Sequence, residues 1–280
     1  ALTNCDRAEQ MFRDRCTGVA WERATARSFA LWSLSFQGEI AELSRRWPEL
    51  LKEAGERGDR YFVMNLGTYV MSVVRLAADD PADAHEGLRQ NLARWSQQGY
   101  HVQHNDVLWA MAQVELYRGR GQEAWELLCS RWPDLSRSML LRVQFIRVAM
   151  GHLRARCALA AAGGATAPGP LLRSAESSAR ALEREGAPWS RSLALLIRAG
   201  LLATRGDRSG AITRLADAEA AFRSAGMALY AESAKRRRGQ LMGSPDGDDL
   251  VSQTESWMAS QGIRDPARMA AMFAPGFDGL

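Results

Sequence analysis

Two histidines and an aspartate lie close enough along the chain to suggest a metal site. His101 and His104 are three residues apart and Asp106 follows two residues later, and imidazole combined with carboxylate is a ligand set that Zn²⁺ and related ions accept. The three residues span a predicted turn and the start of a predicted helix, where such side chains commonly cap the helix or face solvent. We therefore interpret them as capping or surface residues and predict no metal site.

The other motifs that would carry chemistry are incomplete. A P-loop requires Gly-Lys-Ser/Thr, but Lys52 follows a leucine and Lys235 follows an alanine. His85-Glu86 would open a zinc-protease helix, yet Arg89 occupies the place of the second histidine. Protein-kinase motifs and the G-x-S-x-G serine elbow are absent from the sequence, and no pair of carboxylates stands out as an acid–base pair. The sequence predicts a protein that is not an enzyme and that carries no cofactor.

Composition indicates the kind of element that positions these residues. Of the 280 residues, 46% are hydrophobic, which is enough for a buried core. Ala, Leu, Arg, Glu and Gln fill most windows of the sequence, whereas alternating runs of β-branched residues are nearly absent. The composition therefore predicts an all-α protein.

The net charge of +4 arises from interspersed acidic and basic residues. All but two of the 36 basic residues are arginine, a bias that we attribute to codon usage in a GC-rich genome. The one dense basic run, residues 235–238, lies in a helical pattern, where we favour a solvated helix face over a phosphate contact. Nucleic acid is therefore not the partner that we predict.

Cysteine usage and hydropathy bear on the compartment. The cysteines are neither paired as C-x-x-C nor clustered, which is typical of free, buried thiols in a reducing cytoplasm; they are Cys5, Cys16, Cys129 and Cys157. No leader opens the chain and the most apolar stretch, 193–204, contains Arg198, so we predict neither a signal peptide nor a membrane span. Because the chain begins at Ala1 without a methionine, we expect a fragment of a larger protein.

Glycines that end amphipathic segments recur with a period of about forty residues. Each is followed by an apolar or aromatic helix start; they are Gly58, Gly99, Gly186, Gly226 and Gly262. Successive intervals are 41, 87, 40 and 36 residues, and a polar break at 134–138 lies near the one missing marker. Glycine suits these places because helices often end on a residue in the left-handed conformation.

A second set of breaks lies midway between those glycines. The breaks are at Gly38, 79–81, 119–121, 163–170, 206–207 and 243–248. Each repeat is therefore helix, short turn, helix, and a single hairpin cannot bury its apolar side without a stacked neighbour. We predict a right-handed α-solenoid of about six tetratricopeptide-like hairpins, forming one domain over residues 1–280 with C-terminal capping helices at 246–280.

Three repeats share small residues at matched positions, which would let paired helices approach closely. In the first helices these residues are Ser72, Ala112 and Ala199, and in the second helices they are Ala84, Ala124 and Ala211. A leucine follows each of the second set by four residues, on the same helical face, at Leu88, Leu128 and Leu215. This is the tetratricopeptide spacing in longer units.

The same register gives the positions of a partner-binding groove on two first helices. They are Tyr69, Val73, Asp106, Trp109, Gln113 and Tyr117. Aromatic anchors beside a few polar groups suit a peptide groove, although the simpler interpretation of Trp109 and Tyr117 is packing between repeats. The equivalent positions before Gly206 are too apolar for an open groove, and we expect them to pack against the C-terminal helices; they are Leu193, Leu196, Gly200, Ala203 and Thr204.

Two parts of the sequence resemble a known family. Residues 15–22, 29–32 and 38–43, together with the tail at 257–269 and 274–277, look like the C-terminal helical region of large bacterial serine/threonine kinases. In those proteins a kinase domain is joined to an AAA-type ATPase and then to tetratricopeptide-like repeats. The resemblance implies a sensor or docking arm whose partners include the upstream kinase and ATPase domains, and no catalytic residue of those domains has a counterpart here.

Three functions remain open at this stage. We favour a cytoplasmic, non-catalytic scaffold that binds a protein or peptide partner. The alternative is a sensor that binds a small-molecule effector inside the superhelix, which a closed, largely apolar cavity of ligand size would support. The third is a helical-repeat nucleic-acid binder, for which the arginine content is the only argument.

Overall fold

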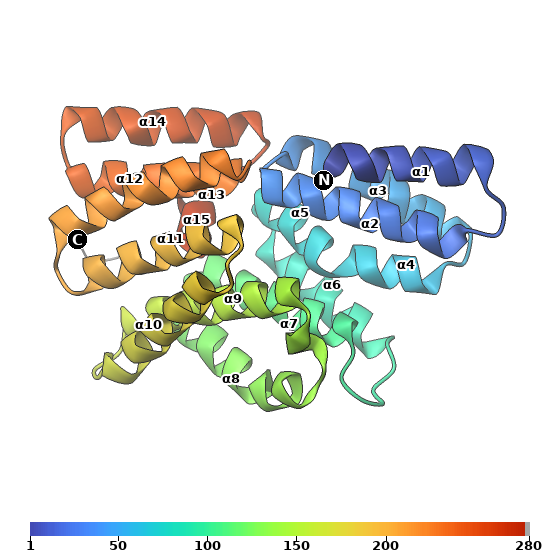
Figure 1. Ribbon diagram of the computed structural model, residues 1–280, viewed down its shortest axis with the longest axis horizontal. Coiled ribbons are helices and arrows are strands. Elements are labelled where there is room, and N and C mark those ends of the chain that lie inside the picture. Colours follow the sequence, from blue (N-terminus) through green and yellow to red (C-terminus); the bar gives the residue numbers. More distant parts are fainter. Residues whose placement is uncertain (278–280) are drawn as a thin grey trace.

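The computed structural model describes residues 1–277, which fold into helices joined by short turns with no β-strand among them (Figure 1). In chain order the elements are α1 (Leu2–Arg15), α2 (Ala20–Gln37), α3 (Ile40–Glu56), α4 (Arg60–Asn65), a π-helical segment (Leu66–Val70), α5 (Met71–Ala77), α6 (Pro81–Ala93), α7 (Val102–Tyr117), α8 (Gly121–Arg137), a 3₁₀ turn (Leu140–Arg142), α9 (Gln144–Ala162), α10 (Gly169–Arg184), α11 (Pro188–Thr204), α12 (Arg208–Ser224), α13 (Ala228–Met242), α14 (Pro245–Ser260) and α15 (Pro266–Phe273).

Six antiparallel hairpins follow one another between α2 and α14. Their first helices are α2, α4 with α5, α7, α9, α11 and α13, and these begin at residues 20, 60, 102, 144, 188 and 228. Each is paired with the helix that follows it, and consecutive hairpins stack into a curved array (Figure 1). The predicted all-α solenoid of about six hairpins is confirmed.

The turns between hairpins depend on left-handed residues at the predicted markers. At Gly186 and Gly226 the backbone φ angles are 72° and 69°, a conformation that strains any residue with a β-carbon. The missing marker is replaced by a 3₁₀ turn at Leu140–Arg142, because α8 continues through the expected break and ends at Arg137.

The small residues at matched repeat positions are completely buried in the contacts between paired helices. All six have 0% of their surface exposed, and they are Ser72, Ala84, Ala112, Ala124, Ala199 and Ala211. The helices approach as closely elsewhere: a β-carbon added to Gly121 would lie 2.5 Å from the backbone carbon of Ala160. A larger side chain at such a place would force the helices apart.

The π-helical segment interrupts the first helix of the second hairpin, and side chains satisfy the carbonyl groups that it frees. Trp47 Nε1 donates to the Leu66 carbonyl oxygen at 2.8 Å, and Asn91 Nδ2 donates to the Gly67 carbonyl oxygen at 2.6 Å. Thr68 has the non-helical angles φ −109° and ψ −115°. Such bulges re-aim the side chains around them, and here Tyr69 lies on the inner surface of the array.

The array curves until its first and last hairpins touch. Gly38, at the end of α2, approaches α13 so closely that an added β-carbon would lie 2.7 Å from the backbone nitrogen of Leu229. The predicted capping segment, 246–280, contains two helices in the described part of the chain, and its residues 278–280 lie outside the described residues. Helix α14 completes the sixth hairpin, whereas α15 turns inward and packs against α7 and α13.

Candidate functional site

The C-terminal segment, residues 264–277, occupies one half of the inner surface formed by the first helices. Its main chain is held at three places: the Arg264 amide donates to the Ala77 carbonyl oxygen at 2.9 Å, Arg156 Nη1 donates to the Met272 carbonyl oxygen at 3.0 Å, and Arg237 Nε donates to the Ala274 carbonyl oxygen at 2.9 Å. Five of the segment's apolar side chains are at most 3% exposed; they are Met269, Ala270, Met272, Phe273 and Ala274. The chain thus fills part of its own groove.

Helix α11 is shaped to receive this segment. A β-carbon on Gly200 would lie 2.9 Å from the Pro275 carbonyl oxygen, and one on Gly276 would lie 3.4 Å from the Gly200 carbonyl oxygen and from Thr204 Oγ1. The expected packing against the C-terminal part of the chain is confirmed for Gly200 and Thr204, which contact Pro275 and Gly276 beyond the end of α15. For Leu193, Leu196 and Ala203, which are buried, it stays a prediction.

Two of the predicted groove residues lie beneath the same segment. Gln113 Oε1 accepts a hydrogen bond from Arg156 Nη2 at 3.2 Å, and the Tyr117 hydroxyl donates to Asp79 Oδ1 at 2.9 Å. Asp79 also pairs with Arg268 of α15 at 3.1 Å. Gln113 and Tyr117 are each only 1% exposed, so an outside partner cannot reach them while the segment is in place.

The other half of the inner surface is a cluster of aromatic rings from several first helices. Tyr69 lies between Trp32 and Trp109, with ring centroids 4.7 Å and 4.6 Å away. Phe145 lies 5.4 Å from Trp32, and Trp189 lies 6.0 Å from Phe145. Offset and edge-on contacts of this kind stabilise the cluster beyond the burial of area alone.

Most of the exposed large apolar side chains lie on the helices that contribute to this cluster, or on segments directly before them. Of the seven large apolar side chains that are exposed in residues 1–277, six lie on α2, α4 or the segment 139–145. Trp21 and Phe29 continue along α2 the helical stripe of Trp32 and Phe36, while Tyr61 and Met139 line one shallow hollow. We define the aromatic surface as Trp21, Phe29, Trp32, Phe36, Tyr61, Met139, Val143, Phe145 and Trp189.

Sequence reasoning did not find the aromatic surface, although a signal for it exists. An aromatic residue is the second residue of four first helices, at Trp21, Tyr61, Phe145 and Trp189. Three of these stand three residues after a glycine of positive φ. Equivalent positions in a solenoid face the same way, so the recurrence predicts one shared surface.

The six predicted groove residues do not form an open groove. Five are at most 3% exposed, namely Tyr69, Val73, Trp109, Gln113 and Tyr117. They support the aromatic cluster or the C-terminal segment from below, because the first helices pack side by side and α15 covers the rest. Only Asp106 keeps part of its surface exposed. Partner contact by these residues stays a prediction.

Asp106 is the fifth residue of α7, and burial raises the pKa of its carboxyl group to about 7. A weak hydrogen bond from Asn105 Nδ2 at 3.4 Å opposes this rise. Since the folded pKa exceeds the ordinary value of 3.8, the folded state favours the protonated acid, and stability should fall as pH rises from about 4 to about 7. Asp106→Asn should remove this dependence and raise the free energy of unfolding at pH 8 by up to about 2 kcal/mol.

Urea unfolding of both proteins at pH 5, 6, 7 and 8 checks this prediction. The difference in stability between Asp106→Asn and the parent should grow with pH and level off above pH 7. Parallel stability curves over the whole range would show that Asp106 is ordinarily ionised in the folded protein.

The residues considered for chemistry have structural partners. His104 Nδ1 accepts from the backbone nitrogen of His101 at 3.1 Å, as a helix-capping group does. In the described part of the chain, no group of three or more His, Cys, Asp or Glu side chains is placed to hold a metal ion. The cysteines are free, but Cys16 and Cys129 are exposed, so the expectation that all four are buried was wrong.

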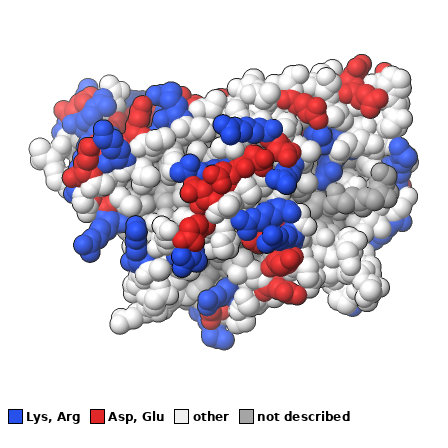
Figure 2. Space-filling view, turned by 180° about the vertical axis from the view of Figure 1, so that it is seen from behind, with Lys and Arg blue, Asp and Glu red and all other residues white. Residues whose placement is uncertain are grey.

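The basic run at 235–238 is not the solvated face that we predicted. Arg236 and Arg237 are 7% and 5% exposed because α14 and the C-terminal segment cover this side of α13. Arg236 pairs with Glu255 at 2.8 Å, and Arg238 pairs with Glu219 at 2.7 Å. Figure 2 shows acidic and basic side chains mixed over the visible face, which gives no broad basic field of the kind that phosphate backbones favour.

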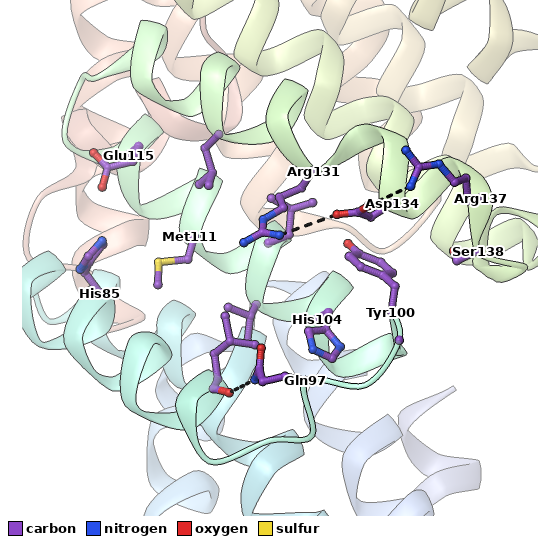
Figure 3. A pocket seen from close by; sticks show the side chains of 15 residues that line it. His85, Gln97, Tyr100, His104, Met111, Glu115, Arg131, Asp134, Arg137 and Ser138 are labelled. Atoms are coloured by element: carbon purple, nitrogen blue, oxygen red, sulfur yellow. Dashed lines mark hydrogen bonds and ion pairs between the residues drawn. The ribbon is translucent and has the colours of Figure 1, made fainter.

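A separate cleft of about 670 Å³ lies on the outer side of the array, between α6 and α8 (Figure 3). Its floor is one face of α7, which contributes His104, Val107, Leu108, Met111 and Glu115. Its walls come from α6 and α8, and the segment that joins α6 to α7 closes one end with Gln97, Gly99 and Tyr100. The volume falls in the range of small-molecule sites.

Fold and surfaces define the class of the molecule: an all-α helical-repeat protein with an aromatic inner surface and an outer cleft. No match to this chain was found among models of known protein families, curated proteins or solved structures. No helix within residues 1–277 is both long enough and apolar enough to cross a bilayer. Its function therefore has to be inferred from its own surfaces.

Proposed function

We propose that the chain is a non-catalytic interaction domain that docks a protein or peptide partner on the aromatic surface. The single observation that carries this proposal is the concentration of exposed apolar side chains there. Trp21 and Phe29 are each 61% exposed, and Met139 is 60% exposed. Soluble proteins rarely expose such a group of large apolar side chains unless it binds something.

The chemistry of the surface suits a protein partner. Aromatic rings give large contact areas at little cost in side-chain entropy, and they dominate the binding energy of many interfaces. The rings of Trp32, Phe36 and Phe145 are held in place by the buried Tyr69 and Trp109 beneath them, so these three need little ordering on binding. At the edge, Arg147 Nη2 donates to Glu185 Oε2 at 2.7 Å, which gives the surface a polar rim near Phe145 and Trp189.

The first candidates for the partner are upstream kinase and ATPase domains of the same protein. This part of the proposal rests on the resemblance of residues 15–22, 29–32 and 38–43, and of the tail, to the C-terminal regions of bacterial kinase–ATPase proteins. In such an arrangement the domain would act in the cytoplasm as a docking or sensor arm that restrains or releases the catalytic domains.

Phe145→Asp should weaken binding of the partner at least tenfold, about 1.4 kcal/mol or more. Phe145 is 36% exposed and touches four other rings, so a carboxylate there would be desolvated against an apolar partner. Trp109→Ala is a poorer test because Trp109 is buried and its loss would destabilise the cluster.

Two measurements test this prediction. One is the affinity of the chain for purified upstream domains, and the other is the set of proteins that the chain captures from cells of the native source. Met11→Asp is the control, since Met11 is 47% exposed on α1 and is not one of the residues of the aromatic surface. Equal retention of the partner by both variants would exclude the aromatic surface as the docking site.

A small-molecule sensor is the second candidate function. The outer cleft favours it, because its volume suits a ligand, although the sequence-based expectation was a ligand inside the superhelix, where the C-terminal segment now lies. Nucleic-acid binding has no comparable support, since the densest basic run is engaged in internal contacts.

A further inference from the structure

The outer cleft has a polar end where Tyr100, Arg131, Asp134 and Arg137 meet (Figure 3). Arg131 and Arg137 both pair with Asp134, at 3.7 Å and 3.5 Å. Two guanidinium groups share one carboxylate, so this end of the cleft has a net charge of +1. Both arginine side chains are more than half exposed, and their remaining N–H groups are free to turn toward a ligand.

The Tyr100 hydroxyl adds an unsatisfied donor at the same place. Its oxygen is buried but has no hydrogen-bond partner, and the ring points toward Asp134 between the two arginines (Figure 3). A buried hydroxyl without a hydrogen-bond partner destabilises the folded state, because it has lost its contact with water. A ligand oxygen in the cleft would remove this penalty.

The opposite end of the cleft has one carboxylate among its lining residues, and two arginines outside the lining offset its charge. Glu115 lines it, but Arg118 Nη1 lies 3.1 Å and Arg120 Nη1 lies 3.7 Å from the Glu115 carboxylate oxygens. The other titratable groups that line the cleft are His85 and His104. Burial lowers the pKa of His104, so this histidine is neutral at neutral pH. It therefore gives no positive partner to Asp134 or Glu115.

Between the two ends the lining is apolar. Leu92 contributes from α6, Leu127 from α8, and Val107, Leu108 and Met111 from the floor. The floor runs along α7 from His104 to Glu115, a distance of about 16 Å at 1.5 Å per residue. An extended hydrocarbon chain of about ten carbons, or a pair of fused rings, fits such a strip.

We propose that this cleft binds a small amphipathic monocarboxylate, with the carboxylate at Arg131, Arg137 and Tyr100 and the apolar body along α7. A single negative charge matches the net charge of +1 at the polar end, and guanidinium groups are the side chains best suited to carboxylates. Tyr100 and Arg137 also line the hollow that contains Tyr61 and Met139, so the polar end of the cleft adjoins the aromatic surface. Phe145 does not line the cleft, so Phe145→Asp should weaken partner docking without changing ligand binding.

Calorimetric titration of the full chain with decanoate tests the proposal, with decanol and decyltrimethylammonium as probes of equal chain length. Decanoate should bind with one site per chain and at least tenfold more tightly than either of the other probes. Equal affinity for the three head groups, or no saturable binding of decanoate, would overturn the proposal, because the carboxylate would then contribute nothing.

Variants locate the site. Arg131→Ala should weaken decanoate binding at least tenfold, and Tyr100→Phe should weaken it about threefold to tenfold. Met111→Trp should abolish binding, because the indole would fill the space above the floor of the cleft. Arg214→Ala is the matched control, since Arg214 pairs with Asp217 three residues on, as Arg131 pairs with Asp134. If Arg131→Ala and Arg214→Ala bind decanoate equally while both remain folded by circular dichroism, the carboxylate is not held in this cleft.

Discussion

Phe273→Ala should lower the free energy of unfolding by about 3–5 kcal/mol. Phe273 belongs to the C-terminal segment, is 3% exposed, and meets the Tyr230 ring edge-on at a centroid distance of 4.7 Å. The Arg156 guanidinium lies 5.7 Å from the same ring. Truncation would leave a cavity at the centre of the array and remove the apolar neighbour of a fully buried charge.

Urea denaturation measures this loss, and Phe29→Ala is the matched control because Phe29 is 61% exposed. The control should change stability by about 0.5 kcal/mol or less. If Phe273→Ala were no more destabilising than Phe29→Ala, the C-terminal segment would not occupy the inner surface in solution.

Ala211→Trp should destabilise the protein by about 1–3 kcal/mol or more, because an indole cannot fit where α11 and α12 meet. Ala211 is 0% exposed, and its position is one of the small-residue positions that recur through the repeats. Separation of the two helices would also disturb Ala199, which is buried in the same pair.

Thermal unfolding of Ala216→Trp provides the comparison, since Ala216 is exposed on the same helix. The midpoint should fall by several degrees more for Ala211→Trp than for Ala216→Trp. Identical midpoints would show that the small residue is not required for the close approach of the helices.

The fold could be predicted because its signals are local. Left-handed glycines, mid-repeat breaks and small residues all act within one hairpin or between neighbours, and a solenoid repeats these contacts along the chain. Two residues show this. Gly186 was predicted to end a helix in the left-handed conformation and has φ 72°, and Ala124 was predicted to lie between paired helices and is 0% exposed.

The closure of the array could not be predicted in this way. It depends on contacts between distant parts of the chain, such as Gly38 with Leu229 and Arg264 with Ala77, and no pattern within one repeat specifies them. The same closure explains the error at 235–238: Arg237 is polar, yet the folded C-terminal segment covers it and its Nε donates to the Ala274 carbonyl oxygen.

Contacts between distant parts of the chain also explain why most of the predicted binding residues are buried. The tetratricopeptide register placed Trp109 and Tyr117 correctly on the first helix of a hairpin, but register alone does not say what covers that helix. Trp109 became the support of an aromatic surface, and Tyr117 lies under α15, where Arg268 is 5.9 Å from its ring. The exposed residues that could bind a partner are Phe145 and its neighbours in the aromatic surface, which pack on the buried Trp109.

Photo-crosslinking from position 145 tests most directly whether the aromatic surface docks a partner. A benzoylphenylalanine at Phe145, introduced into the chain in cells of the native source, should crosslink one dominant protein. The same group at the exposed Thr213 on α12 should not capture that protein. Equal capture of the same proteins from both positions, or no crosslink from position 145, would contradict the account.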